Sequence, residues 1–344
     1  LKTKCFYSNI EKAFDLLKEV AFESKLDHKK RLKEIIGQIY TNLKITLTET
    51  GHKSAANRAM SYFSEYAAYR EAIQGITMYE TVKKWYEDFD EEYDNIVNGL
   101  KEAAKVIFEK QNMTISYTGK EEAPEFMKKA EVESFIEGLY EDQKQGEKVK
   151  VTCTKSNEGF ATAGGVQYVA CAGNFKDAGL EYTGALKVLQ MIFSYEYLWI
   201  QIRVKGGAYG CMCSFSDQGD SMFVTYRDPN LSESYKVYDE AADYVADFDA
   251  DDRDMKKYII GTIGSMDMPM EAVDMGARSF HAYFLGKTEA DLQKVRDQVL
   301  SCTQEDIRAL APIVKAVVEA GNRCCIGNEE KIDQNKEYFD EVKH

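Results

Sequence analysis

The sequence predicts an α+β fold with one complete domain and one mostly helical, truncated copy of the same domain. In the complete domain we expect a mixed or antiparallel sheet that helices cover on one side. Three observations lead to this prediction. Helical spacing dominates the first 145 residues, short β-branched segments gather between residues 146 and 226, and a motif of the first part returns near the end. A length of 344 residues also favours two domains.

The N-terminal region is predicted to be a series of helices. No proline occurs before Pro124, so the residue that most often breaks helices is absent there. Apolar residues recur at helical spacing, and a break near Gly75 is expected within the third segment. The predicted helices cover residues 13–22, 27–50, 54–85, 91–110 and 124–140. A short strand is predicted at Met113–Thr118, and a polar linker at 141–148.

The second region changes in character, because short β-branched runs alternate with glycine-containing turns. Three of these runs, separated by Gly206-Gly207 and by residues 217–219, are predicted to form a meander of hairpin-like strands. The predicted strands cover 148–154, 165–171, 202–204, 209–215, 221–226 and 323–326. The main predicted helices of this region cover 182–199, 233–248 and 329–342.

An internal repeat supports the division into domains. Lys33–Ile39 matches Lys257–Ile263 at an offset of 224 residues, and Arg58–Phe63 resembles Arg278–Phe284 with one residue inserted. The segment from 146 to about 225 has no counterpart in the N-terminal region. We therefore expect residues 1–145 to be the C-terminal part of a truncated domain and residues 146–344 to be a complete one.

Charge and hydropathy exclude several classes of protein. The chain has 44 Lys and Arg against 58 Asp and Glu, a net charge of −14, and no basic stripe, so we expect neither nucleic acid nor an anionic membrane as partner. No apolar run is long enough to span a bilayer. The N-terminus lacks the apolar region of a signal peptide, so a cytoplasmic location is expected. The chain starts at Leu1 and not at Met, which suggests a piece of a longer polypeptide.

Cysteines and histidines limit the chemistry further. The eight cysteines form no Cys-x-x-Cys pair, and without a secretion signal we expect reduced, mostly buried thiols. The four histidines are His28, His52, His281 and His344, and none has a second histidine at the spacing of a zinc peptidase motif. His52 is expected in a turn, and His281 is expected to be packed. The sequence therefore predicts no metal site within this chain.

One glycine-rich segment carries a candidate site. Lys205–Gly210 lacks the Gly-Lys-Ser/Thr ending of a phosphate loop, so the plain interpretation is a tight turn in which glycine supplies a positive φ. The sharper interpretation includes two donors beside it. Arg203 is permanently charged, and Tyr209 sits between small neighbours that leave its hydroxyl accessible. Together they could hold a peptide carbonyl or a developing oxyanion.

These residues carry a family resemblance. Arg203–Gly210, followed by Ser221–Tyr226 and Arg227–Leu231, resembles the C-terminal half of the insulinase/pitrilysin-type zinc metallopeptidases, in their presequence-protease-like branch. Gly159–Tyr168, Tyr182–Leu186 and Gly51–Arg58 are similar to the same branch. The resemblance covers essentially the whole chain, and its most specific part is residues 203–231.

The resemblance implies a zinc-dependent endopeptidase that degrades peptides inside a closed chamber made of two halves. The zinc site, with an inverted His-x-x-Glu-His motif, would lie in an N-terminal half that is absent from this chain. Arg203 and Tyr209 match the residues that reach the substrate carbonyl, and Gly206, Gly207 and Ala208 would contact the substrate. This chain alone is expected to bind no zinc and to be inactive, with the N-terminal half and peptides as its partners. The alternative is a non-catalytic peptide-binding or scaffold subunit of the same superfamily.

Overall fold

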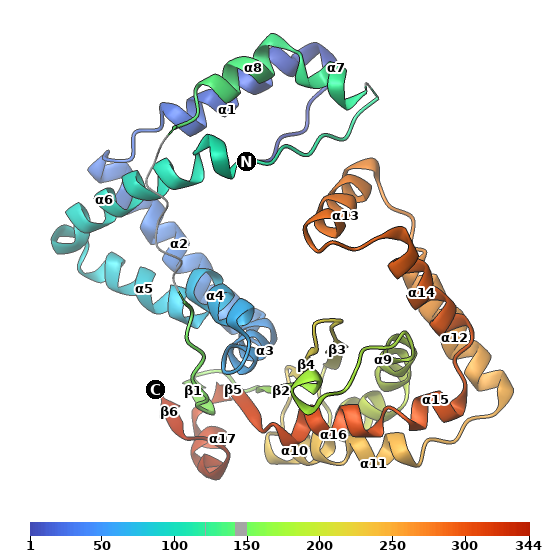
Figure 1. Cartoon of the computed structure of the whole chain (residues 1–344). Helices are drawn as coiled ribbons and strands as arrows, with labels where there is room; N and C mark the ends of the chain where they lie inside the picture. The colour runs from blue at the N-terminus through green and yellow to red at the C-terminus, as the bar shows by residue number, and fades with distance from the viewer. Residues whose placement is uncertain (121, 142–149) are drawn as a thin grey trace. The chain divides into compact units, whose positions relative to one another are not determined.

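The chain forms two compact units, and each unit is drawn from separate stretches of sequence. The computed structural model describes residues 1–120, 122–141 and 150–344. The first unit contains the described residues of 1–40, 82–149 and 270–286. The second contains residues 41–81, 150–269 and 287–344. The boundary falls inside two helices, α2 (Lys29–Glu49) and α5 (Ile76–Glu87) (Figure 1).

The first unit is helical. Its aromatic side chains hold α1 against α8, because the Phe135 ring lies 6.1 Å from that of Phe14 and 5.5 Å from that of Phe22, measured between centroids. Besides parts of α2 and α5, its elements are η1 (Tyr7–Asn9), α1 (Ile10–Phe22), α6 (Phe89–Ile107), η2 (Lys110–Asn112), α7 (Ala123–Met127), α8 (Ala130–Glu137) and α13 (Ala272–Phe284).

Two predictions for the first unit are wrong in detail. Met113–Thr118 is not a strand, because the described part of this unit offers no strand for it to pair with. The segment is held by a side chain instead, since Tyr117 stacks on Phe126 with 3.9 Å between ring centroids. The helix predicted at 124–140 is two short helices, α7 and α8. Apart from residue 141, the predicted linker lies outside the described residues.

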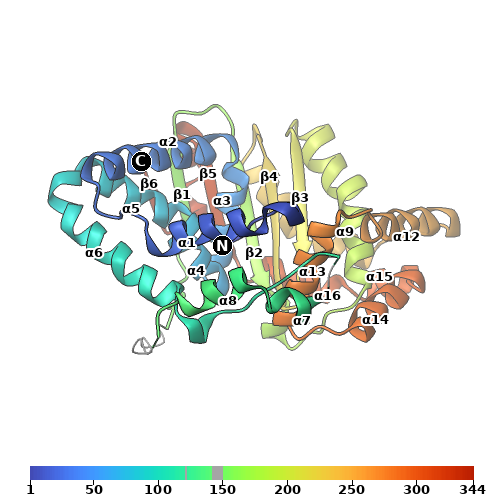
Figure 2. The ribbon, with the colours of Figure 1, turned by 90° about the horizontal axis from the view of Figure 1, so that it is seen from above.

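The second unit is built on one mixed sheet of six strands in the order β3-β4-β2-β5-β1-β6, which Figure 2 shows side by side. The pairs β3–β4, β4–β2 and β2–β5 are antiparallel, and β5–β1 and β1–β6 are parallel. The strands are β1 (Glu158–Thr162), β2 (Tyr168–Asn174), β3 (Gly210–Phe215), β4 (Asp220–Tyr226), β5 (Asn322–Asn328) and β6 (Glu341–Lys343).

The remaining elements of this unit are helical. They are α3 (Gly51–Ser61), α4 (Glu65–Gln74), η3 (Phe175–Ala178), α9 (Ala185–Tyr195), η4 (Trp199–Lys205), α10 (Ser232–Asp239), α11 (Ala241–Ala246), α12 (Asp252–Met266), α14 (Glu289–Leu300), α15 (Gln304–Arg308), α16 (Ala311–Glu319), α17 (Glu329–Gln334) and η5 (Lys336–Tyr338). The predicted α+β class is confirmed, with a helical N-terminal region and one mixed sheet.

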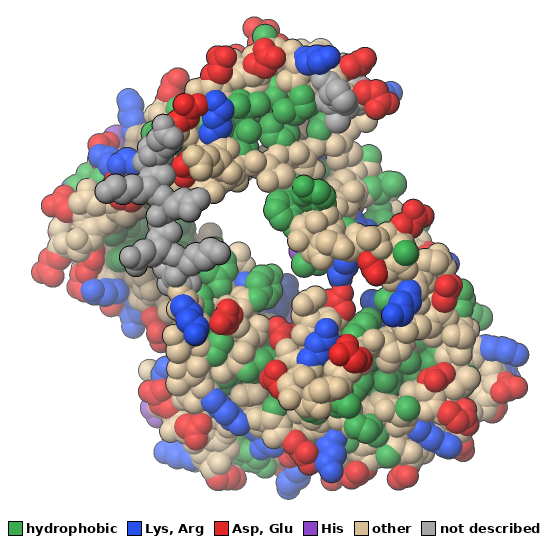
Figure 3. Space-filling model, in the orientation of Figure 1, with side chains coloured by type: hydrophobic (Ala, Val, Ile, Leu, Met, Phe, Trp, Pro, Cys, Tyr) green, Lys and Arg blue, Asp and Glu red, His purple; other side chains and the backbone are tan. Residues whose placement is uncertain are grey.

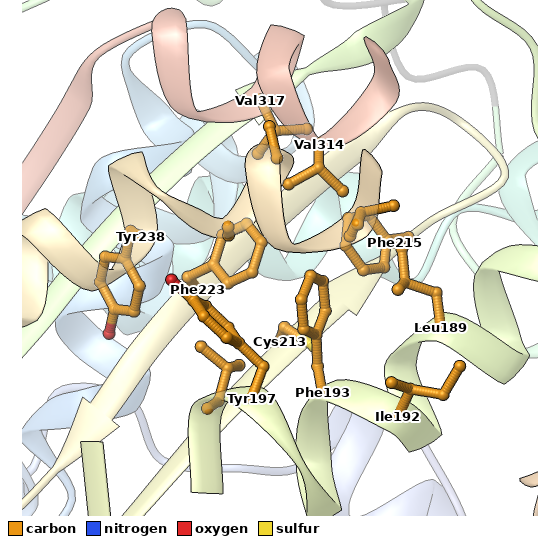
Figure 4. Packing of buried hydrophobic residues seen from close by; sticks show 14 of the residues in the cluster. Leu189, Ile192, Phe193, Tyr197, Cys213, Phe215, Phe223, Tyr238, Val314 and Val317 are labelled. Atoms are coloured by element: carbon orange, nitrogen blue, oxygen red, sulfur yellow. The ribbon is translucent and has the colours of Figure 1, made fainter. Parts of the chain in front are cut away.

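The two faces of the sheet are packed differently, as the alternation of side chains along a strand requires. On one face Phe193 of α9 meets Phe215 and Phe223, with centroids 6.4 and 5.7 Å away, under α16 (Figure 4). The opposite face is apolar as well and receives α3, whose alanines at positions 55, 56 and 59 contact Ala170 and Val224 among others. A helix of the N-terminal region therefore covers the sheet face that the helices following β2 leave open.

Several predicted strands and helices differ from the structure. Residues 150–157 form no strand, and the strand lies further along, as β1. Ile202–Val204 is part of η4 and not a strand, because Ile202 is buried while Val204 is 66% exposed, whereas a strand would place both on one face. The helix predicted at 329–342 ends at Gln334, and its last residues form β6. The helix predicted at 54–85 consists of α3, α4 and α5.

Candidate functional site

The candidate site begins with η4, a helix of π type that follows α9. Leu198 and Ile202 are buried and anchor it, and Trp199 and Val204 are exposed to solvent. The helix ends where Gly207 adopts a φ of +82°, a left-handed conformation that glycine takes without strain. Runs of π-helix are rare and occur often at functional sites.

The three small residues after η4 use their N–H groups inside the turn. Gly206 donates to the carbonyl of Gln201, Gly207 to that of Arg203 and Ala208 to that of Ile202, at 3.0 to 3.1 Å. The carbonyl of Gly206 accepts a hydrogen bond from Asn230 Nδ2 at 2.6 Å. Their amides are therefore engaged in closing the helix end, and Ala208 is buried.

Arg203 is held between two aromatic rings. Its guanidinium carbon lies 4.2 Å from the centroid of the Trp199 ring and 5.4 Å from that of Tyr209. Its Nη1 donates a hydrogen bond of 2.6 Å to the backbone carbonyl of Tyr209. The arginine is half-buried, and its planar group is oriented by these three contacts. The structure therefore brings Arg203 and Tyr209 together, as the sequence suggested.

Tyr209 presents its ring to solvent directly before β3. The side chain is 65% exposed, and its hydroxyl has no hydrogen-bond partner among the described residues. The backbone N–H of Tyr209 donates to the carbonyl of Arg227 at 3.3 Å. An exposed hydroxyl beside an oriented guanidinium can donate to a carbonyl oxygen that approaches from solvent.

The turn after β4 supports this arrangement from below. Asp228 is fully buried, accepts hydrogen bonds from Ser234 Oγ at 2.6 Å and from the Asn230 amide at 2.9 Å, and pairs through its backbone with Gln167. Burial raises the pKa of Asp228, although these hydrogen bonds oppose the shift. Arg227, just before it, has a φ of +50° and offers its carbonyl to Tyr209. The conspicuous sequence 227–231 thus forms the support of the Arg203–Tyr209 turn.

Sequence reasoning missed three residues beside Tyr209. Tyr226 lies edge to face against Tyr209, His52 against Tyr226, and Trp199 beneath Arg203. His52 is not in a turn but in the first turn of α3. The available signals were the four-residue spacing from Trp199 to Arg203 on a helix and the position of Tyr226 at the end of a predicted strand.

The chain's own residues do not fit a zinc site. Among the described residues, no group of three or more His, Cys, Asp or Glu side chains is placed to hold a metal ion. His28 accepts a hydrogen bond from the Arg31 amide, His52 packs against tyrosines, and His344 pairs with Glu329. His281 is exposed on α13, so its predicted packing is wrong.

The described surface is charged. On the face drawn in Figure 3, acidic and basic side chains are interspersed with apolar ones. Within the described residues, no helix combines the length and the apolar character needed to cross a membrane.

Comparison with known proteins gives a consistent result. Residues 157–328, half of the chain, match the family model of the PreP C-terminal domain, and residues 1–85 match that of the associated region of subfamily C of the M16 peptidases. Protein HypA of Clostridium perfringens is 37% identical over 99% of this chain and 35% of its own length. Presequence protease 1, chloroplastic/mitochondrial, of Arabidopsis thaliana is 27% identical over 100% of this chain and 32% of its own length.

The fold agrees with these matches. The crystal structure of pitrilysin superimposes with a TM-score of 0.57 over 93% of this chain and 33% of that one, at 13% identity. The chain spans about a third of the length of the curated relatives it matches. Together with the two family models, this likeness shows that the chain belongs to the M16 peptidase family and corresponds to the C-terminal half of its presequence-protease-like branch.

Proposed function

We propose that this chain is the C-terminal half of a zinc-dependent endopeptidase that degrades peptides inside a closed chamber. In this proposal residues 146–344 are one complete peptidase-type domain, residues 1–145 are the end of a preceding one, and the partner is an N-terminal catalytic half of the same polypeptide. The family membership and the relatives named as presequence proteases support the proposal. The cytoplasmic location stays a prediction.

The observation that carries the proposal is the pairing of Arg203 with Tyr209. A peptide carbonyl gains negative charge on its oxygen when it is attacked, and donors aimed at that oxygen lower the barrier. Tyr209 offers a free, exposed hydroxyl, and Arg203 adds a fixed positive charge that remains at every working pH. Gly206, Gly207 and Ala208 keep the two side chains close and form the wall beside the substrate.

The zinc of this family is assigned to the absent N-terminal half, because this chain's donor set does not fit the metal. When bound there, zinc would supply an activated water. This chain's own contribution is to hold the peptide, to orient its carbonyl and to stabilise the developing charge. Alone, it is expected to be inactive.

Replacing Tyr209 tests the role of its hydroxyl. In the complete polypeptide, Tyr209→Phe removes only this donor and should lower kcat for peptide cleavage by about 10- to 100-fold. Tyr66→Phe is the matched control, since Tyr66 is a similarly exposed tyrosine, at 67%, with Arg70 near its ring. Steady-state kinetics on a fluorogenic peptide measure both, and an unchanged kcat in Tyr209→Phe would remove Tyr209 from the mechanism.

Replacing Arg203 tests the second donor. Arg203→Lys keeps the charge but loses the planar group that lies between two rings, so kcat should also fall, whereas Arg70→Lys should have no effect. If the complete polypeptide binds peptides and cleaves none, the alternative of a non-catalytic peptide-binding or scaffold subunit holds instead.

A further inference from the structure

Tyr209 is the end of a chain of ring contacts that starts on α3. The Tyr209 and Tyr226 centroids are 5.7 Å apart with the ring planes at 80°, and those of Tyr226 and His52 are 4.8 Å apart at 71°. Both are edge-to-face contacts, the geometry that aromatic pairs favour. Residues of an N-terminal helix and of β4 thus meet beside the candidate donor.

The inner end of this chain is firmly anchored. Tyr168 of β2 is buried, stacks on Tyr226 at 5.9 Å and donates a hydrogen bond of 2.7 Å to the carbonyl of Thr48. The backbone of Gly51 lies so close to this ring that an added Cβ would be 2.6 Å from Tyr168 Cε2. Tyr168 and Gly51 therefore fix where His52 and Tyr226 can lie.

The outer end depends on its ring contacts. The backbone around Tyr209 is held by the β3–β4 pairing of Gly210 with Tyr226, but the Tyr209 hydroxyl has no hydrogen-bond partner among the described residues. The side chain is 65% exposed, so few contacts restrict its torsion angles. Tyr226 and the guanidinium of Arg203 are the groups found against its ring.

We propose that Tyr226 and His52 are positioning residues that hold the Tyr209 ring in the orientation needed by its hydroxyl. This inference rests on the function proposed above for Tyr209. The two rings lie in a row behind Tyr209, and the anchored Tyr168 fixes the far end of that row. The site is then assembled from residues on both sides of position 145, and α3 takes part in it.

The charge state of His52 suits this role. Burial, with a smaller contribution from Lys53, lowers the pKa of His52, so its ring is neutral at neutral pH. A neutral imidazole packs against tyrosine rings without the cost of a desolvated charge. His52 is therefore expected to act as an aromatic ring here and not as an acid or base.

A spectroscopic label on Tyr209 tests the positioning directly. We would incorporate 3-fluorotyrosine at position 209 of the complete polypeptide and record ¹⁹F spectra of variants. Tyr226→Leu and His52→Ala should move the resonance toward that of free fluorotyrosine and narrow it. Tyr226→Phe and His52→Phe keep an aromatic ring and should leave the signal near its original position.

Kinetics on the same variants, without the label, complete the test. Tyr226→Leu should lower kcat by about tenfold or more while KM changes by less than about twofold, since misplacing a reacting group affects the chemical step. Tyr226→Phe should restore most of kcat. Tyr244→Leu is the control for general loss of packing, because Tyr244 stacks on Tyr197 at 4.5 Å in the separate core on the other face of the sheet.

The outcomes separate the two proposals. An unmoved ¹⁹F signal in Tyr226→Leu, or an equal loss of kcat in Tyr244→Leu, overturns the positioning role. If Tyr209→Phe itself leaves kcat unchanged, the proposed function fails, while the ¹⁹F shift still decides whether the rings hold Tyr209. If Tyr226→Leu does not fold, His52→Ala and its His52→Phe rescue give the same decision.

Discussion

Glu158, at the start of β1, joins distant parts of the second unit through a buried polar cluster. Its carboxylate accepts two hydrogen bonds from Arg58, at 2.5 and 2.9 Å, one from Lys343 at 2.6 Å and one from the Tyr62 hydroxyl at 2.9 Å. The Glu158 side chain is only 2% exposed. A carboxylate in this position remains charged because its partners compensate for the lost hydration.

Removing the charge of Glu158 should destabilise the fold. Glu158→Gln leaves Arg58 and Lys343 partly buried without their counter-charge, which should cost about 3 kcal/mol of unfolding free energy. Urea denaturation measures the change through its midpoint. Glu34→Gln is the matched control, since the Glu34–Arg31 pair is exposed and should contribute less than about 0.5 kcal/mol. Equal effects of the two substitutions would contradict a stabilising role for the cluster.

The same carboxylate predicts a pH dependence of stability. Burial would raise the pKa of Glu158, but the hydrogen bonds from Arg58 and Lys343 outweigh it and lower the pKa below its usual value. A lowered pKa means that the unfolded chain takes up this proton first. The contribution is therefore complete above about pH 5 and is lost as the pH falls through the folded value. Between about pH 5 and 3, the wild-type chain should lose stability more steeply than Glu158→Gln.

At the scale of elements, α3 depends on close contact with the sheet. Gly51 is buried, and a Cβ there would lie 2.6 Å from a ring carbon of Tyr168, itself buried in β2. The helix must therefore begin with glycine to reach this position. The alanines that follow let the helix backbone lie close to the sheet.

A pair of glycine substitutions tests this packing. Gly51→Ala should lower the unfolding free energy by about 1–3 kcal/mol, because Tyr168 must move out of its place. Gly99→Ala in α6 is the matched control, since no atom lies within 4 Å of the added methyl group, and it should raise stability by about 0.5–1 kcal/mol. Thermal unfolding followed by circular dichroism measures both. A neutral Gly51→Ala would show that α3 is seated more loosely than the structure has it.

At the scale of the whole molecule, the thiols report on opening of the fold. Cys5 is exposed, Cys153 and Cys211 are half-buried, and the other five cysteines are buried. Burial raises the pKa of Cys171 and of Cys302 to about 12, so these thiols are protonated at neutral pH. The prediction of mostly buried, reduced thiols is confirmed.

Thiol labelling should therefore occur in two stages. With a chromogenic disulfide reagent at pH 8, one thiol should react fast in the native chain, and Cys5→Ser should remove that phase. The remaining thiols should react only as the fold opens, at rates that rise in the destabilised Glu158→Gln variant. Cys302→Ser is the control that should leave the fast phase intact. Several fast thiols in the native chain would contradict this description.

Much of the local structure could be predicted from the sequence. Periodicity located most helices and the strands β2 to β5, and the spacing of Arg203 and Tyr209 around a glycine turn indicated the candidate site. These features depend on residues that are close in sequence, so a pattern within a short window is enough to predict them. The α+β class follows from the same patterns.

Only the tertiary structure decided what depends on distant partners. Ile202–Val204 resembles a strand locally but is helical, since burial of Ile202 in the core outweighs β propensity. β1 is defined by its neighbours β5 and β6, and β6 by β1, all from far along the chain. In the same way, no local pattern could show that His52 and Tyr226 lie beside Tyr209. Side chains of separate elements meet only when the sheet and α3 have packed, and that packing is a property of the whole unit.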